Sequence, residues 1–186
     1  MPERRPRADA VRNRQRVLSA AREAFAAEGP AVSLDDVARR AGVGPGTVHR
    51  HFPTKDALFA AVIADRLADL AAGARDLADA PDPGRAFYDF FHRLAAEAGQ
   101  NLALSAALTD PAQVGAAIHA AGADLETALA ALLRRAQDAG AVRADLTTTE
   151  LHAVIAGALL MEQRLPESSK GYGLRLVADG LAQRPG

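Results

Sequence analysis

A short segment near the N-terminus carries polar residues whose types and spacing suit binding chemistry: Thr47, Arg50 and His51. Val48 and Phe52, which are four residues apart, give this segment one apolar face if it is helical. The hydroxyl, guanidinium and imidazole groups then lie on the outward face. We therefore expect the segment to offer polar groups to a partner while its apolar face anchors it to the protein.

The distribution of charge indicates the kind of partner. Residues 1–60 contain eleven Arg or Lys and seven Asp or Glu residues, a net charge of +4, and the rest contains eleven and sixteen, a net charge of −5. The total of −1 hides this division. A basic N-terminal part favours an anionic partner, although a solvated basic tail gives the same count.

Two short helices are expected to position these groups. Ser33 can cap the first, with Asp36 three residues on as a variant of the capping box, and this helix ends at Gly42. Pro45 suits the first turn of the second helix. Two short helices joined by a glycine-containing turn form the helix-turn-helix pattern, which also occurs as a purely structural corner. The outward polar groups and the basic N-terminus favour the binding interpretation.

The whole chain is expected to be all-α. Apolar residues recur at spacings of three and four, and no stretch alternates long enough to predict a strand. Thr147 and Glu150 have the spacing of a capping box. The helices are expected at residues 11–27, 33–42, 45–52, 54–79, 85–98, 100–109, 112–139, 148–164 and 169–182.

Residues 37–59 strongly resemble the DNA-binding segment of the TetR family, and the resemblance extends over roughly residues 12–60. The positions that follow the family pattern are Gly46-Thr47, His51-Phe52, Lys55 and Leu58-Phe59. The chain departs from this pattern at His49, where the family usually has a tyrosine that commonly contacts a backbone phosphate. Imidazole can still donate one hydrogen bond at this position.

The resemblance implies an N-terminal three-helix DNA-binding domain, residues 1–54, and a helical effector-binding and dimerisation domain, residues 55–186. The partner would be a pseudo-palindromic double-stranded DNA operator, bound by a homodimer. Residues facing the major groove would be Pro45, Gly46, Thr47 and Arg50, with Arg50 reaching guanine O6 and N7. Residues holding phosphates would be Ser33, Thr47, His49, His51 and Lys55. A disordered basic arm with Arg4, Arg5, Arg7, Arg12 and Arg14 would add backbone or minor-groove contacts, unless it is simply solvated.

The family resemblance also implies an effector pocket and a dimer interface in the second half. Candidate pocket residues are Phe87, Phe91, Leu108, His119 and Met161, although such apolar residues are more often ordinary core. Two apolar stripes are expected to dimerise, unless they are intramolecular core. The stripes are Leu151, Val154, Ile155, Ala158 and Leu159 in one helix, and Leu174, Val177 and Leu181 in the next.

Other chemistries find little support. The chain has no cysteine, and its five histidines lack the paired spacing of a metal site, so neither a metal nor a cofactor is expected. No serine lies in a nucleophile elbow and no carboxylate pair has a telling spacing, so no catalytic residue is assigned. No segment has about 18 consecutive apolar residues, and the N-terminus lacks a signal-like stretch, so we expect a cytoplasmic protein.

The sequence therefore predicts a DNA-binding transcriptional regulator, a repressor released from its operator by a small molecule. Two alternatives stay open. One is a DNA-binding dimer without a small-molecule effector. The other is a helical ligand-binding protein or enzyme in which the helix-turn-helix is only structural.

Overall fold

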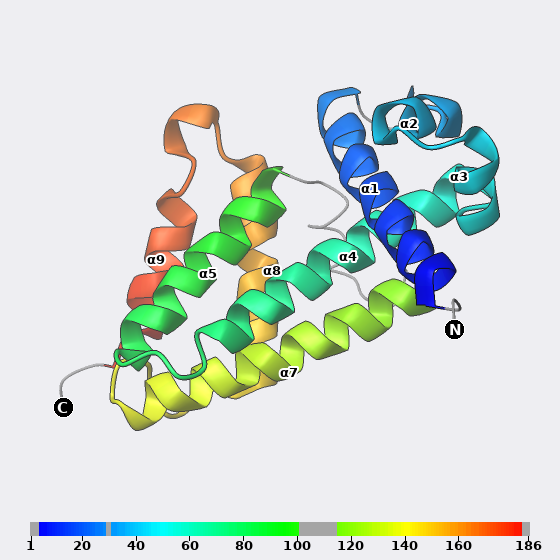
Figure 1. Ribbon diagram of the computed structural model, residues 1–186. Coiled ribbons are helices and arrows are strands. Elements are labelled where there is room, and N and C mark those ends of the chain that lie inside the picture. The colour runs from blue at the N-terminus through cyan, green and yellow to red at the C-terminus, as the bar shows by residue number, and fades with distance from the viewer. Residues whose placement is uncertain (1–3, 29–30, 101–114, 184–186) are drawn as a thin grey trace. The chain divides into compact units, whose positions relative to one another are not determined.

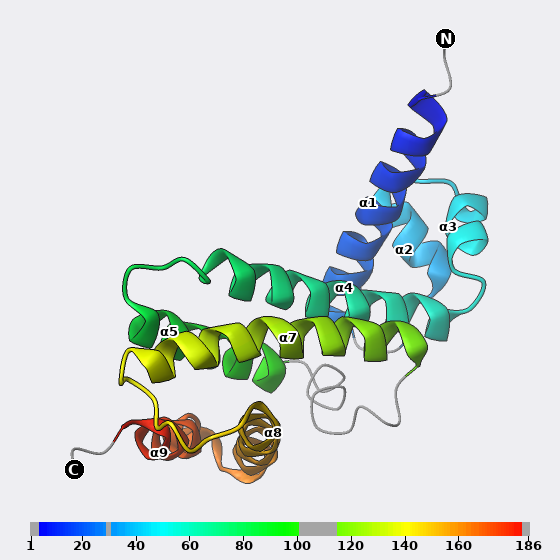
Figure 2. The ribbon, with the colours of Figure 1, turned by 90° about the horizontal axis from the view of Figure 1, so that it is seen from below.

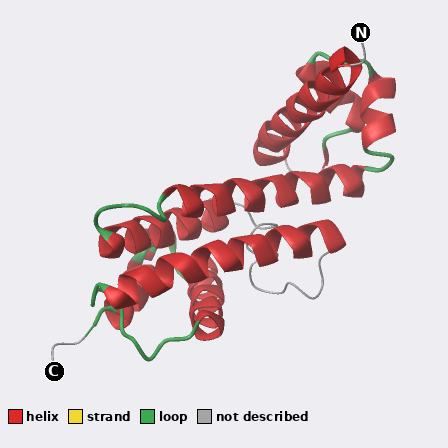
Figure 3. Cartoon of the chain, turned by 60° about the horizontal axis from the view of Figure 1, so that its bottom comes forward, coloured by secondary structure: helices red, strands yellow, loops and turns green. Residues whose placement is uncertain are grey.

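The computed structural model describes residues 4–28, 31–100 and 115–183 (Figure 1). Within these ranges the regular elements are helices linked by loops, which confirms the predicted all-α class (Figure 3). They are α1 (Arg4–Glu28), α2 (Leu34–Ala41), α3 (Pro45–His51), α4 (Lys55–Asp76), α5 (Pro83–Gln100), α7 (Ala116–Asp138), α8 (Thr148–Arg164), a short 3-10 helix (Glu167–Ser169) and α9 (Tyr172–Leu181). The helix expected at 100–109 lies almost entirely outside the described residues.

The start of the chain differs from its prediction. Helix α1 begins at Arg4, not near Val11, so the expectation of a disordered arm is wrong from residue 4 onward. Pro6 falls in the first turn, where its missing N–H costs nothing, and arginine is a good helix former. Asp9 and Arg12, three residues apart on α1, form an ion pair that a helix favours.

Residues 1–65 form one compact unit. In it α1 packs on α2, and α2 packs on α3. Buried residues from all three helices, together with Leu58 and Val62 of α4, make one hydrophobic core. The unit extends past the expected boundary at residue 54 because the first turns of α4 complete this core.

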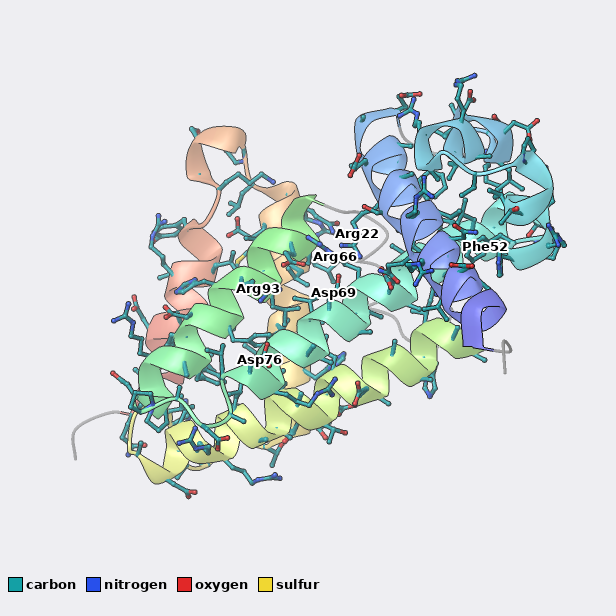
Figure 4. The ribbon with its side chains drawn as sticks, viewed as in Figure 1. Arg22, Phe52, Arg66, Asp69, Asp76 and Arg93 are labelled. Carbon is teal, nitrogen blue, oxygen red and sulfur yellow. The ribbon has the colours of Figure 1, made fainter. Side chains whose placement is uncertain are left out.

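Residues 66–186 form the second unit. Here α5 packs on α7 and α8, and α8 lies beside α9 (Figure 2). The largest buried side chains include Phe87, Phe90 and Phe91 of α5. Glu97 of α5 pairs with Arg66 of α4 at 2.9 Å, which ties these two helices together (Figure 4).

Helix α7 is long and apolar enough to cross a membrane, judged by length and composition alone. Its side chains Leu125, Leu129, Leu132 and Leu133 are buried in the second unit. Its Asp124 pairs with Arg75 of α4 at 2.9 Å. These are the contacts of a helix that packs in a folded domain.

The apolar stripes expected at a dimer interface lie elsewhere. Leu151, Ile155, Ala158, Leu159 and Leu181 are buried within the chain itself, as the alternative interpretation held. Val154, Leu174 and Val177 are partly buried. The exposed apolar residues of these two helices are Leu160, Met161, Tyr172 and Leu176. Helix α8 is apolar on both sides, and periodicity does not tell which side the same chain covers.

Candidate nucleic-acid interface

Ser33 and Gly42 define the two ends of α2. The Ser33 hydroxyl accepts a hydrogen bond from the Asp36 N–H at 3.1 Å, the contact expected of an N-cap. Gly42 ends the helix in the left-handed region, with φ 62°. Val43 N–H donates to Ala38 O at 3.0 Å across this end. The turn therefore leads directly from α2 into α3, as the sequence predicts.

Arg16 of α1 holds the turn from outside. Its Nη2 donates to Gly42 O at 3.3 Å. A Cβ added at Gly42 would lie 2.7 Å from that nitrogen, so a larger residue would displace Arg16 as well as strain the backbone. Sequence reasoning missed this role, because a contact between residues 26 positions apart leaves no local spacing signal.

Helix α3 is anchored by its apolar side. Val48 is fully buried and Phe52 is 3% exposed. The guanidinium carbon of Arg14 lies 5.6 Å from the centre of the Phe52 ring, a cation–π distance (Figure 4 labels Phe52). Arg14, expected in a flexible arm, is thus part of the folded unit.

The opposite side of α3 faces solvent. Pro45, Gly46, His49, Arg50 and His51 are exposed, and Thr47 is partly exposed. The orientation expected from the sequence is therefore confirmed for this helix. Ser33 and Lys55 are also exposed.

Arg50 and His49 contact other groups of the same unit. Arg50 Nε donates to Gly46 O at 3.0 Å, one turn back along α3. His49 Nε2 lies 3.3 Å from Asp35 Oδ1 of α2. The imidazole thus links the two helices of the motif, a contact that no short sequence pattern predicts.

Charge is arranged along α2 as a helix favours. Asp35 and Asp36 lie in its first turn and Arg39 and Arg40 in its last. The hydrogen bond from the Ser33 side chain, with smaller effects of the Ser33 backbone and Arg39, lowers the pKa of Asp36 below its ordinary value. An ion pair with Glu28 raises the pKa of Arg40. Both groups therefore carry full charge near neutral pH.

Helix α4 is capped at its start and fixed to α1 along its first half. Thr54 Oγ1 accepts from Ala57 N–H at 3.1 Å, the contact of an N-cap. Arg22 of α1 pairs with Asp65 of α4 at 2.7 Å (Figure 4). The rings of Phe25 and Phe59 meet edge to face at 5.4 Å. These contacts make α1, the motif and the first half of α4 one body.

The candidate effector residues do not share one environment. Phe87 and Phe91 are fully buried, whereas His119 and Met161 are exposed. Leu108 lies outside the described residues. A surface hollow of about 310 Å³ opens between residues 143–145 and 182–183, and none of the four described candidates lines it. Among the described residues, no group of three His, Cys, Asp or Glu side chains could hold a metal ion.

Two models of known protein families match this chain. Residues 17–62 match the family of bacterial regulatory proteins of the tetR type. Residues 82–183 match the C-terminal domain of SbtR-like transcriptional regulators. The chain belongs to the TetR family. It is accordingly a helix-turn-helix transcriptional regulator.

Solved structures agree over almost the whole chain. The TetR regulatory protein of Mycobacterium vanbaalenii is 40% identical, with a TM-score of 0.71, over 95% of this chain and 98% of that one. The TetR regulator SCO0520 of Streptomyces coelicolor is 32% identical, with a TM-score of 0.72, over 92% of this chain and 99% of that one. Both TetR-family relatives therefore share the fold from the motif to the last helix.

A curated relative matches over part of its length. The transcriptional regulator TtgW of Pseudomonas putida is 45% identical over 64 residues, 34% of this chain and 48% of that protein. The match spans less than half of the relative's length. A match of this extent says nothing about ligands.

Proposed function

We propose that this TetR-family regulator acts as a dimeric repressor that binds a pseudo-palindromic operator through α3 and is released by a small molecule. The observation that carries the proposal is the orientation of α3. Val48 and Phe52 are buried, and Arg50 and His51 are exposed beside the partly exposed Thr47. A short helix held in this way can enter a major groove with its polar side toward the bases.

Base recognition is assigned to the exposed face of α3. Arg50 would meet guanine O6 and N7, the most common specific contact of arginine in a major groove. Pro45 has no N–H to donate, so it would make only apolar contact, as with a thymine methyl. Gly46 has no neighbour within 4 Å of an added Cβ, so a base edge or a phosphate can approach its backbone closely. Thr47 completes this face.

Phosphate contacts are assigned to residues around that face: Ser33, Thr47, His49, His51 and Lys55. All are at least partly exposed, and they come from the starts of α2 and α4 and from α3. Such contacts fix the register of the protein on the duplex without reading sequence. His49 would have to leave Asp35 to donate its hydrogen bond to a phosphate.

Dimerisation is assigned to α8 and α9. Regulators of this family bind DNA as dimers. Four of the five large apolar side chains that are exposed among the described residues lie on these two helices: Leu160, Met161, Tyr172 and Leu176. An exposed cluster of this kind is typical of a surface that a partner covers. The two recognition helices of the dimer would then lie about 34–36 Å apart, in successive major grooves.

Control by a small molecule is assigned to the C-terminal unit, and we assign the chain no catalytic activity. The solved structure of SmeT, which shares this fold at 21% identity and a TM-score of 0.58, is a complex with triclosan. A ligand that binds the released conformation about 100-fold better shifts the equilibrium by roughly 2.7 kcal/mol. Such a protein would act in the cytoplasm, where its operator is.

The DNA-binding assignment is tested with duplexes selected from a random pool by the parent protein. Arg50→Ala should lose about 1–3 kcal/mol of discrimination between the selected site and a variant with one guanine replaced. Arg85→Ala removes an exposed arginine of α5 and is the matched control; it should bind like the parent. Selection of no common sequence, or discrimination unchanged in Arg50→Ala, would contradict the assignment.

The effector assignment needs a separate measurement. Compounds that raise the unfolding temperature of the protein are tested for release of the selected duplex. Release by a stabilising compound supports a small-molecule effector. A compound library that stabilises nothing, with operator binding intact, would favour a regulator without one.

A further inference from the structure

Glu162, near the end of α8, has an unusual place for a carboxylate. It is 7% exposed, and no other charged residue in the described part of the chain is buried. Its Oε2 accepts from Gly171 N–H at 2.6 Å, and its Oε1 accepts from Leu174 N–H at 3.2 Å. Gly171 is the N-cap residue of α9, and Leu174 is the third residue of that helix. One carboxylate from α8 therefore satisfies the amides at the start of α9.

Helix α9 needs this outside acceptor. At the start of α8 the cap residue supplies its own, since Thr147 accepts from Glu150 N–H at 3.2 Å. Gly171 has no side chain, and its φ of 79° is strained for the residues that usually cap. Glu162 takes over the acceptor's task, and Lys170 donates to the Glu162 carbonyl oxygen beside it.

The lack of a side chain at Gly173 allows the two helices to approach closely. A Cβ at Gly173 would lie 2.4 Å from Met161 Cε and 3.0 Å from Glu162 Oε1. Helix α9 has ten residues, too few to be stable alone in water. Its position therefore depends on α8, and the carboxylate is the polar part of that attachment.

The exposed face of α9 is self-complementary. Tyr172 and Leu176 are four residues apart and both are exposed, at 53% and 51%. Arg175 and Asp179 are exposed on the same side and have opposite charges. In a two-fold dimer each surface meets its own copy, so antiparallel α9 helices would place each Arg175 near the Asp179 of the other subunit. A second copy of the chain is thus the occupant that this face fits.

We propose that the Glu162 carboxylate is a positioning group for the homodimer. It holds α9 against α8 so that Tyr172 and Leu176 join Leu160 and Met161 in one face that a second copy covers. The inference rests on the dimer in the proposed function, and it adds the residue on which the geometry of the interface depends.

Glu162→Gln tests the proposal in the full-length protein without DNA. The amide has nearly the same shape, but its NH₂ group cannot accept from an N–H. The dissociation constant of the dimer, measured by sedimentation equilibrium, should rise about tenfold or more. In amide exchange followed by NMR, Gly171 and Leu174 should exchange faster. Glu126→Gln, an exposed carboxylate of α7, is the matched control and should change neither quantity.

Two further variants separate positioning from simple damage. Leu176→Asp should weaken the dimer through the face itself, whichever acceptor caps α9. Glu162→Asp keeps the charge on a side chain one methylene shorter and should fall between the parent and Glu162→Gln, which keeps the test usable if the latter folds poorly.

Three results would overturn the proposal. They are a parent protein that stays monomeric at every concentration, a Glu162→Gln dimer as tight as the parent's, and unchanged exchange of the α9 amides in that variant. Because no DNA is present, a failure of operator binding would not affect these measurements. The inference and the proposed DNA function therefore fail separately.

Discussion

Arg50 and Gly46 are joined along the exposed side of α3 by a hydrogen bond from Arg50 Nε to the Gly46 carbonyl oxygen, at 3.0 Å. With Nε engaged on the helix, a guanine would be met by the two terminal nitrogens of the guanidinium. The side chain is therefore partly ordered before DNA arrives, which reduces the entropy lost on binding.

Arg50→Lys separates recognition from charge. Lysine keeps the positive charge but lacks the planar fork that matches guanine O6 and N7. Preference for guanine at one position of each half-site should fall by about 1–3 kcal/mol, while the salt dependence of binding stays the same. Fluorescence anisotropy over single-base variants measures this. A lysine variant that keeps its preference at every position would show that another residue reads the base.

Lys55→Ala should act in the opposite way. Lys55 is exposed at the start of α4, and we propose a phosphate contact for it. Its loss should weaken all duplexes alike and lower the slope of log K against log salt by about 1. Titrations at several salt concentrations give the slope. A change confined to the selected site would instead point to a base contact.

Gly42→Ala should destabilise the N-terminal unit. The left-handed φ of 62° costs a residue with a Cβ roughly 1–2 kcal/mol, and the new atom would also meet Arg16 Nη2 at 2.7 Å. Gly46→Ala is the control, because nothing lies within 4 Å of its Cβ. Chemical unfolding should show a lower free energy of unfolding for Gly42→Ala and little change for Gly46→Ala. Equal stabilities would mean that the turn is not held as described.

Acid should reveal the Ser33 cap. In the folded protein, the hydrogen bond of the Ser33 side chain lowers the pKa of Asp36 below its ordinary value of 3.8. A lowered folded pKa adds stability above about pH 4, and that stability is lost as the pH falls through the folded value. Ser33→Ala should cost about 0.5–2 kcal/mol near neutral pH. The difference in unfolding free energy between this variant and the parent should become smaller as the pH falls.

Unfolding curves recorded from about pH 3, below the ordinary pKa of Asp36, to about pH 7 measure this change in the stability difference. Ser19→Ala, on the exposed side of α1, is the control and should shift stability equally at all pH values. A Ser33→Ala difference that does not depend on pH would separate the cap from Asp36.

Local signals predicted the elements that carry the motif. Ser33 and Thr147 cap the helices that their sequence context predicted, and the reciprocal bonds of Thr147 and Glu150 are present. Each of these signals acts over three or four residues. The buried side of α3 followed from the spacing of Val48 and Phe52 for the same reason.

Contacts between distant residues were not predictable in this way. Arg16 reaches Gly42, and Glu162 reaches Gly171, through spatial approach that no short pattern encodes. The prediction of which side of α8 faces outward was also wrong. Both sides of this helix are apolar, and its packing on α5, α7 and α9 decides which side is covered. The pocket residues stay a prediction, because burial and apolar character do not by themselves identify a cavity.

The most direct test of the central claim is dimethyl sulfate footprinting of the selected duplex, which reports access to guanine N7. We expect the parent to protect one guanine in each half-site, with the two about 34–36 Å apart along the duplex. Arg50→Ala should expose both guanines while still binding. Protection that is identical in Arg50→Ala, or absent in the parent, would contradict the placement of α3 in the major groove.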